Sequence, residues 1–166
     1  MFFIAKIVLF TALIPGMVTI YVPYLLLSRS WDTVHSPHAL LAIPAMLIIL
    51  AGIAGYCRCV WEFAVRGLGT PAPLDAPENL VLTGLYQRTR NPMFLSVLLI
   101  LLAEVILFQQ AVLLVYAGCI ALTLHLLVIL YEEPVLRARF GAAYKVYCEA
   151  VPRWGIAVAN SRRYGL

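Results

Sequence analysis

Residues 92–134 read PMFLSVLLILLAEVILFQQAVLLVYAGCIALTLHLLVILYEEP, and this stretch decides the fold. It contains two apolar runs, about residues 93–108 and 111–131, which only Gln109 and Gln110 separate. A helix that crosses a bilayer needs roughly 20 mostly apolar residues, and both runs are close to that length. So short a polar break leaves room only for a tight turn. The sequence therefore predicts a hairpin of two membrane-spanning helices.

The composition of the whole chain agrees with a membrane protein. Hydrophobic residues make up 63% of the 166 residues, and charged residues make up 12%. Soluble domains are about 45–50% apolar and about 25% charged. This composition excludes a soluble globular domain, a disordered chain and a small disulfide-stapled secreted module.

Two further apolar runs, about residues 4–27 and 39–61, also have the length of membrane spans. The first run is too long for the apolar core of a signal peptide, so we expect it to be retained. We therefore predict an all-α integral membrane protein, a single domain over residues 1–166 with about four transmembrane helices. A short helical segment after the fourth span is expected to lie in the cytoplasm or at the membrane interface.

Lys and Arg are distributed unevenly over the ends of these predicted helices. All twelve except Arg29 fall on one side of the predicted membrane. Because basic residues concentrate in cytoplasmic loops, we expect a multi-pass protein with both termini in the cytoplasm. Basic residues in cytoplasmic loops also explain the net charge of +4, so no nucleic-acid partner is expected. Cys57 and Cys59 have no second cysteine pair of matching spacing, so no metal site is expected.

The third span begins in a polar, basic corner. Pro92 suits the first turn of a helix, which makes Asn91 its N-cap, and Arg88 and Arg90 come just before. The positive end of a helix beside two guanidinium groups suits an anionic group such as a carboxylate or phosphate. Arg side chains that reach up to lipid phosphates are the alternative reading of the same residues.

The fourth span ends in two adjacent carboxylates, Glu132 and Glu133, which Pro134 follows. Pro134 disfavours α geometry at Glu133, so we expect the helix to stop or kink there. Carboxylates at a membrane boundary are usually paired or functional, although an acidic cap on the next helix is the alternative. His125 lies seven residues before Glu132, on the same helix face, so His125 and Glu133 are the candidate catalytic residues. A packed, structural histidine is the other possibility for His125.

Taken together, these segments resemble the isoprenylcysteine carboxyl methyltransferase and phospholipid N-methyltransferase family of integral membrane enzymes. The resemblance covers about residues 66–154, in the family's order and spacing. The matching strings are Gly84-Leu85-Tyr86, Arg90-Asn91-Pro92-Met93-Phe94, Glu132-Glu133-Pro134-Val135-Leu136 and Phe140-Gly141-Ala142-Ala143-Tyr144-Lys145-Val146-Tyr147.

The resemblance implies a cytoplasm-facing pocket for S-adenosylmethionine, formed by segments at about residues 66–94 and 132–154. Two positions depart from the family pattern, because Asn91 replaces a histidine and Phe94 replaces a tyrosine. Carried over by position, the cofactor-binding residues are Glu78, Asn79, Leu80, Val81, Tyr86, Asn91, Pro92, Met93, Phe94 and Glu132.

A third departure concerns the methyl acceptor. The isoprenylcysteine enzymes place a substrate-binding arginine one turn before the glutamate pair, and the equivalent residue here is Val128. An apolar residue cannot bind a substrate carboxylate, because burial of an unpaired anion is costly. We therefore expect a lipid or a small lipophilic, membrane-permeable acceptor, with Arg90 and Arg153 available to a lipid phosphate.

The leading hypothesis is thus an S-adenosylmethionine-dependent membrane methyltransferase. One alternative is a nicotinamide-dependent membrane reductase of related architecture. The other is a non-catalytic membrane protein that retains the fold.

Overall fold

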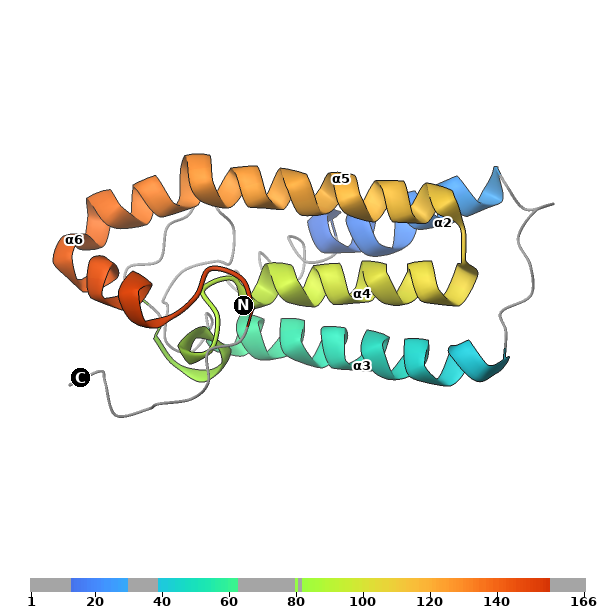
Figure 1. The fold of residues 1–166 in the computed structure, drawn as a ribbon, viewed down its shortest axis with the longest axis horizontal. Coiled ribbons are helices and arrows are strands. Elements are labelled where there is room, and N and C mark those ends of the chain that lie inside the picture. The colour runs from blue at the N-terminus through green and yellow to red at the C-terminus, as the bar shows by residue number, and fades with distance from the viewer. Residues whose placement is uncertain (1–12, 30–38, 63–79, 81, 156–166) are drawn as a thin grey trace, which may run out of the picture.

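The computed structural model describes residues 13–29, 39–62, 80 and 82–155, and within them the chain is helical without a strand (Figure 1). The all-α prediction is therefore confirmed for the described part of the chain. The elements in chain order are the π-helical η1 (Met17–Tyr21), α2 (Val22–Ser28), α3 (Ala39–Glu62), the 3₁₀ turn η4 (Gly84–Gln87), α4 (Pro92–Phe108), α5 (Ala111–Leu127), the π-helical η5 (Val128–Glu132) and α6 (Glu133–Ala150).

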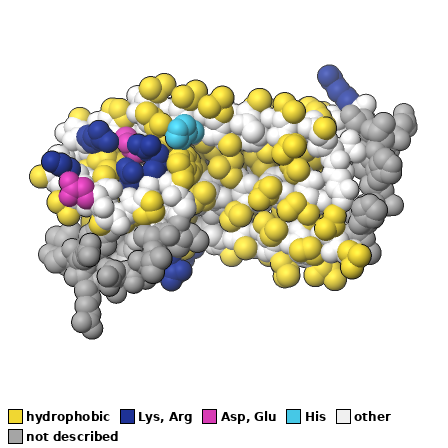
Figure 2. All heavy atoms as spheres, in the orientation of Figure 1, with side chains coloured by type: hydrophobic (Ala, Val, Ile, Leu, Met, Phe, Trp, Pro, Cys, Tyr) yellow, Lys and Arg dark blue, Asp and Glu magenta, His cyan; other side chains and the backbone are white. Residues whose placement is uncertain are grey.

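Among the described residues, two helices are long and apolar enough to cross a membrane. They are Leu40–Glu62 and the continuous Ala111–Ala150, whereas the apolar helices Leu13–Ser28 and Pro92–Phe108 are shorter. Apolar side chains cover the long face of the molecule in Figure 2, as expected where lipid tails replace water. The number of four spans stays a prediction, and the first predicted span extends into residues outside the described part.

The long helices α3, α4 and α5 lie side by side, with α2 against them (Figure 1). Helices α4 and α5 run antiparallel, and Gln109 and Gln110 connect them. Gln109 closes α4 in the left-handed conformation, with φ of 50°, and its N–H still bonds to the Val105 carbonyl. Gln110 is extended, with φ −96° and ψ 125°, and the two residues together reverse the chain direction.

Small residues let α3 and α4 approach closely. A Cβ on Gly52 would lie 2.9 Å from the Ser96 carbonyl oxygen, and one on Gly55 would lie 2.6 Å from Ser96 Oγ. The Ser96 hydroxyl donates to the Pro92 carbonyl within α4, so it presents little polar surface to the interface. Glycines on one face of an apolar helix serve this kind of backbone contact between helices in membranes.

The junction between α5 and α6 differs from the expected stop. Glu133 keeps α-helical angles, φ −63° and ψ −42°, and the helix continues through Pro134. Pro134 has no N–H for the carbonyl four residues earlier, and the π-helical turn η5 lies where that bond is missing. The bend lies further along, at Gly141, with φ 51° and ψ −120°. Beyond it the chain turns back toward the start of α4 (Figure 1).

We expect Gly52→Ala to lower the free energy of unfolding by about 1–2 kcal/mol. Overpacking against a backbone carbonyl costs about 1–3 kcal/mol, and the better helix propensity of alanine returns up to about 1 kcal/mol. Gly118→Ala on α5 is the matched control, because a Cβ there meets nothing within 4 Å and should be neutral or stabilising. Unfolding of the detergent-solubilised protein in SDS measures both. Equal effects of the two substitutions would contradict close packing at Gly52.

Candidate functional site

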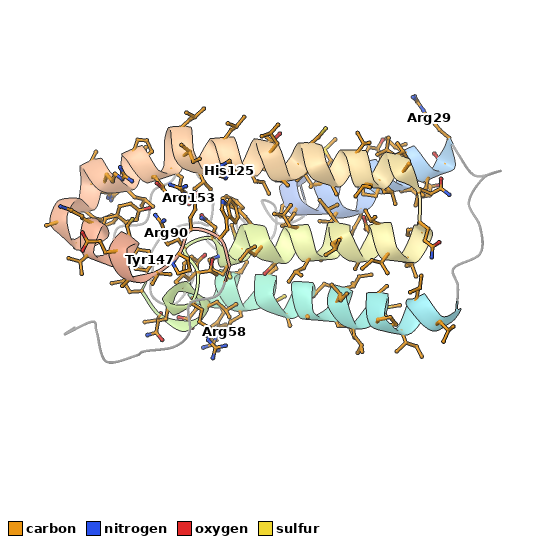
Figure 3. The ribbon with its side chains drawn as sticks, viewed as in Figure 1. Arg29, Arg58, Arg90, His125, Tyr147 and Arg153 are labelled. Carbon is orange, nitrogen blue, oxygen red and sulfur yellow. The ribbon has the colours of Figure 1, made fainter. Side chains whose placement is uncertain are left out.

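A polar cavity of about 60 Å³ lies at the end of the helix bundle where α4 begins and α5 ends. Arg58, Arg90 and Arg153 lie at this end of the molecule, and Arg29 lies at the opposite end (Figure 3). The cavity is lined by Leu80, Tyr86, Arg90, Asn91, Val128, Glu132, Glu133, Leu136, Tyr144 and Tyr147.

Glu62, the last residue of α3, fixes one side of the loop that carries Tyr86. Its carboxylate is buried, accepts a 2.7 Å hydrogen bond from the Thr83 hydroxyl and pairs with Arg58 at 2.8 Å. Gly84 has φ of +61°, and a Cβ there would lie 2.7 Å from Glu62 Oε1. Only glycine satisfies both the left-handed backbone and the close carboxylate. The Gly-x-Tyr motif therefore needs its glycine in order to place Tyr86.

The segment after α6 holds the same loop from the other side. The Tyr147 hydroxyl donates to the Tyr86 carbonyl at 2.7 Å, and the Arg90 N–H donates to the Pro152 carbonyl at 3.0 Å. Asn91 occupies the predicted N-cap position of α4, yet its side chain makes no cap hydrogen bond. Its amide donates to the Arg153 carbonyl at 3.1 Å instead. The N-terminus of α4 is thus tied to the C-terminal segment.

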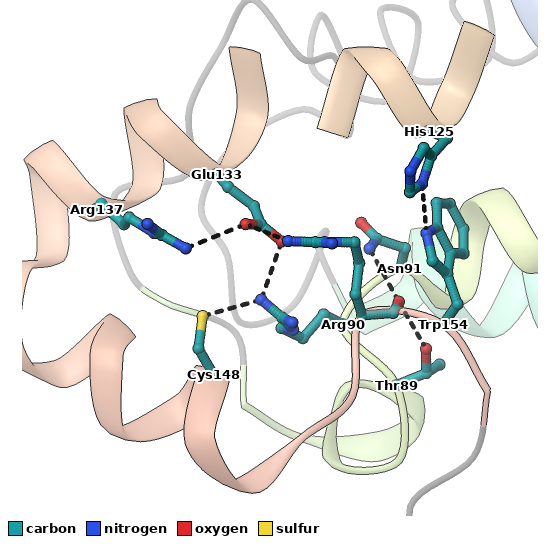
Figure 4. Close-up of polar contacts among 9 residues, drawn as sticks. Thr89, Arg90, Asn91, His125, Glu133, Arg137, Cys148 and Trp154 are labelled. Atoms are coloured by element: carbon teal, nitrogen blue, oxygen red, sulfur yellow. Dashed lines mark hydrogen bonds and ion pairs between the residues drawn. The ribbon is translucent and has the colours of Figure 1, made fainter. Parts of the chain in front are cut away.

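Glu133 lies at the centre of an ion cluster (Figure 4). Arg153 binds it through both oxygens, with Nε 2.6 Å from Oε1 and Nη2 3.0 Å from Oε2. Arg90 Nη1 lies 2.9 Å from Oε1, and Arg137 Nη2 lies 3.3 Å from Oε2. Burial raises the pKa of Glu133, but the hydrogen bond from Arg153 and the charges of Arg90, Arg153 and Arg137 outweigh it, so its pKa is lowered. Glu133 is held ionised.

The neighbouring carboxyl, Glu132, has the opposite environment. Burial, together with the charge of Glu133, raises the pKa of Glu132 to about 7. Its Oε2 is buried and has no hydrogen-bond partner in the described part of the chain. The same holds for Nε of Arg90, which lines the same cavity. A buried polar atom without a partner is uncommon, and it suggests that a ligand completes the site.

His125 lies near this site but does not line the polar cavity. Its Nδ1 accepts a 2.9 Å hydrogen bond from the indole N–H of Trp154 (Figure 4). In neutral imidazole the proton then resides on Nε2, because one ring nitrogen donates and the other accepts. The contact ties the end of α5 to the C-terminal segment.

A second cavity, entirely apolar in its lining surface, has a volume of about 230 Å³ and lies between η1, α3, α4 and α5. The two cavities adjoin along the same helices. Asn91 lines the polar cavity and Phe94, one turn later, lines the apolar cavity. On the neighbouring helix, Val128 lines the polar cavity and Leu124, one turn earlier, lines the apolar cavity.

The structure brings together seven of the residues singled out from the sequence. Met93 and Phe94 line the apolar cavity instead, Pro92 is buried in the first turn of α4, and Glu78, Asn79 and Val81 lie outside the described residues. The seven in the polar cavity are Leu80, Tyr86, Arg90, Asn91, Val128, Glu132 and Glu133.

Tyr144 and Tyr147, which belong to one of the strings that match the family pattern, are both buried and line the polar cavity. Their spacing of three residues on a helix was the available signal, because it puts both on one face. The role of Glu62 was missed, since a lone carboxylate at the end of an apolar run carries no such pattern. In the residues that the structure describes, no three His, Cys, Asp or Glu side chains come together as a metal site.

A family model of phospholipid methyltransferases matches residues 40–143. The match covers more than half of the chain, and the chain belongs to this family. It is therefore an integral membrane protein of a methyltransferase family, and the match gives no support to the reductase alternative. No curated protein matches the chain, and no solved structure does.

We expect Gly84→Ala to lower the free energy of unfolding by about 2–3 kcal/mol. The left-handed conformation costs a residue with a Cβ about 1–2 kcal/mol, and the contact with Glu62 adds to it. Gly155→Ala is the control, because Gly155 also has positive φ, +88°, but no atom within 4 Å of its Cβ position. Unfolding in SDS compares the two. If Gly84→Ala lowers the free energy of unfolding no more than Gly155→Ala does, Glu62 does not restrict this position.

Proposed function

We propose that this protein is an S-adenosylmethionine-dependent methyltransferase that acts at the cytoplasmic face of a membrane on an amine-bearing or neutral lipophilic acceptor. The observation that carries this proposal is the buried, unpartnered Glu132 Oε2 in the polar cavity of a phospholipid methyltransferase family member. A carboxylate oxygen of this kind suits the ammonium group or the ribose hydroxyls of the cofactor.

The walls of the site suit the rest of such a cofactor. Tyr86, Tyr144 and Tyr147 supply aromatic surface beside Glu132, and aromatic rings pack well against a nucleobase. The predicted contacts Glu78, Asn79 and Val81 belong to the same proposal. When bound, the cofactor supplies a methyl group that its sulfonium charge already activates. The residues of this chain therefore have to align the acceptor and exclude water.

Proton transfer is a smaller part of the task. Glu133 is a poor base, because three guanidinium groups stabilise its ionised form. Its role is to position Arg90 and Arg153. His125 uses Nδ1 as an acceptor for Trp154, so its neutral form presents an N–H at Nε2 and positions the C-terminal segment. An ammonium acceptor then loses its proton to water before the transfer.

The apolar cavity supports a place for the acceptor in this proposal. It adjoins the polar cavity along α4 and α5, so an acyl chain there would bring its polar end toward Glu132. Val128 is fully buried between them and offers nothing to a carboxylate. Arg153, whose side chain is 31% exposed, remains available at the rim to a lipid phosphate.

The experiment that tests this function is a ligand screen followed by methyl transfer. S-adenosylhomocysteine should raise the melting temperature of the purified protein, whereas NADPH should not, because only a ligand of the folded state stabilises it. Labelled S-adenosylmethionine should then give base-stable label on membrane lipids. Stabilisation by NADPH would favour the reductase, and stabilisation by neither would favour a non-catalytic protein. Base-labile methyl ester on a farnesylcysteine analogue would overturn the role assigned to Val128.

Glu132→Gln should weaken binding of S-adenosylhomocysteine by about 10- to 100-fold, the contribution of a charge-assisted hydrogen bond of about 1.5–3 kcal/mol. Because the pKa of Glu132 is about 7, affinity of the unmodified protein should fall as pH drops below 7, since protonation removes the charge that binds the ammonium group. Glu132→Gln should abolish this pH dependence. Glu149→Gln, an exposed carboxyl on α6, is the control and should change neither. If folded Glu132→Gln protein binds S-adenosylhomocysteine with unchanged affinity, Glu132 acts only as a helix-capping residue.

A further inference from the structure

Arg90 has a donor that its ion pair does not use. Nη1 contacts both Glu133 Oε1, at 2.9 Å, and Cys148 Sγ, at 3.0 Å, and only 12% of the side chain is exposed. Nε is buried without a partner among the described residues. A guanidinium N–H that loses water and gains no acceptor is costly, so its position needs a reason.

Glu132, in the same cavity, has a buried acceptor atom that lacks a hydrogen bond among the described residues. Within the described part of the chain, its Oε2 is a buried acceptor without a donor, and Arg90 Nε is a buried donor without an acceptor. The two residues would neutralise each other if they met, yet no ion pair joins them. Arg90 is instead held by Glu133, the residue next to Glu132. The ion cluster thus keeps two opposite charges apart on one cavity wall.

A ligand that satisfies both atoms must carry an acceptor for Arg90 Nε and a donor for Glu132 Oε2. An α-amino acid in its zwitterionic form has both, a carboxylate beside an ammonium group. A cavity of about 60 Å³ has room for such a small charged end. The local charge agrees, because Arg90, Arg137 and Arg153 all contact one carboxylate, Glu133, and leave positive charge for a further anion.

We propose that Arg90 Nε binds the carboxylate, and Glu132 Oε2 the ammonium group, of the amino-acid end of the cofactor. This inference rests on the proposed function. It adds Arg90 as the residue that recognises the carboxylate of the cofactor's amino-acid end. It also moves Arg90 from a lipid phosphate contact to the cofactor cavity. Glu133 then acts as a positioning residue, because it orients Arg90 so that Nε stays free.

The test measures dissociation constants for three ligands by calorimetry, with the full chain in lipid nanodiscs. The ligands are S-adenosylhomocysteine, its analogue without the carboxylate and its analogue without the amino group. The unmodified protein should lose tenfold or more in affinity with each deletion, as expected for charge-assisted hydrogen bonds. Equal affinity for S-adenosylhomocysteine and the analogue without the carboxylate would overturn the inference without any variant.

Two variants assign each charged group to its residue. Arg90→Lys keeps the charge but removes Nε, so loss of the ligand carboxylate should then cost less than threefold, while loss of the amino group still costs tenfold. Glu132→Gln should show the reverse pattern. Arg139→Lys, an exposed arginine on α6, should behave as the unmodified protein. If Arg90→Lys responds to both deletions as the unmodified protein does, Arg90 does not bind the carboxylate.

The ligand series also separates this inference from the proposed function. No binding of S-adenosylhomocysteine to the unmodified protein would overturn both. Binding of S-adenosylhomocysteine with equal affinity for its analogue without the carboxylate would overturn only the role of Arg90. Competition of inorganic phosphate with S-adenosylhomocysteine but not with that analogue would support an anion subsite at Arg90.

Discussion

The bidentate pair between Glu133 and Arg153 holds the site together, because it joins segments that are far apart in the sequence. Glu133 lies where α5 gives way to α6, Arg153 follows α6, and Arg90 joins the same carboxylate from the start of α4. A buried carboxylate that lost these partners would be strongly destabilising, since its desolvation would be uncompensated. The same pair determines where Arg90 can point. The arrangement of the polar cavity therefore depends on one carboxylate that does not need to react.

The all-helical architecture and the family could be predicted from the sequence, because apolar run length and ordered motifs are local signals. Gln109 and Gln110 marked the turn between α4 and α5. The glutamate pair drew attention for the right physical reason, since carboxylates at a membrane boundary need partners. The sequence did not show that the two glutamates of that pair have different roles. Burial and three arginines from other segments make Glu133 a structural anion and leave Glu132 with an open oxygen.

Other features were hidden because they depend on tertiary contacts. The expected stop at Pro134 became a π-helical turn, since the missing N–H can be absorbed by a wider turn as well as by a kink. Glu62 constrains Gly84 from a different helix, and nothing local in either segment announces this contact. Asn91 had the right position for an N-cap, but the Arg153 carbonyl competes for its side chain. Each case shows a local preference overruled by a neighbour from elsewhere in the chain.

The three departures from the family pattern, at Asn91, Phe94 and Val128, all lie in the walls of the two cavities. Asn91 and Val128 lie in the wall of the polar cavity, and Phe94 lies in the wall of the apolar cavity, where the related enzymes have histidine, arginine and tyrosine. The replacements remove a titratable group, a cation and a phenol from the region where the cavities adjoin. The cations that remain, Arg90 and Arg153, already pair with Glu133. An acceptor that arrived with a free carboxylate at Val128 would be buried there without a partner, whereas an amine that has lost its proton would enter at little electrostatic cost. The chemistry of this wall therefore favours a neutral reacting group on an apolar body.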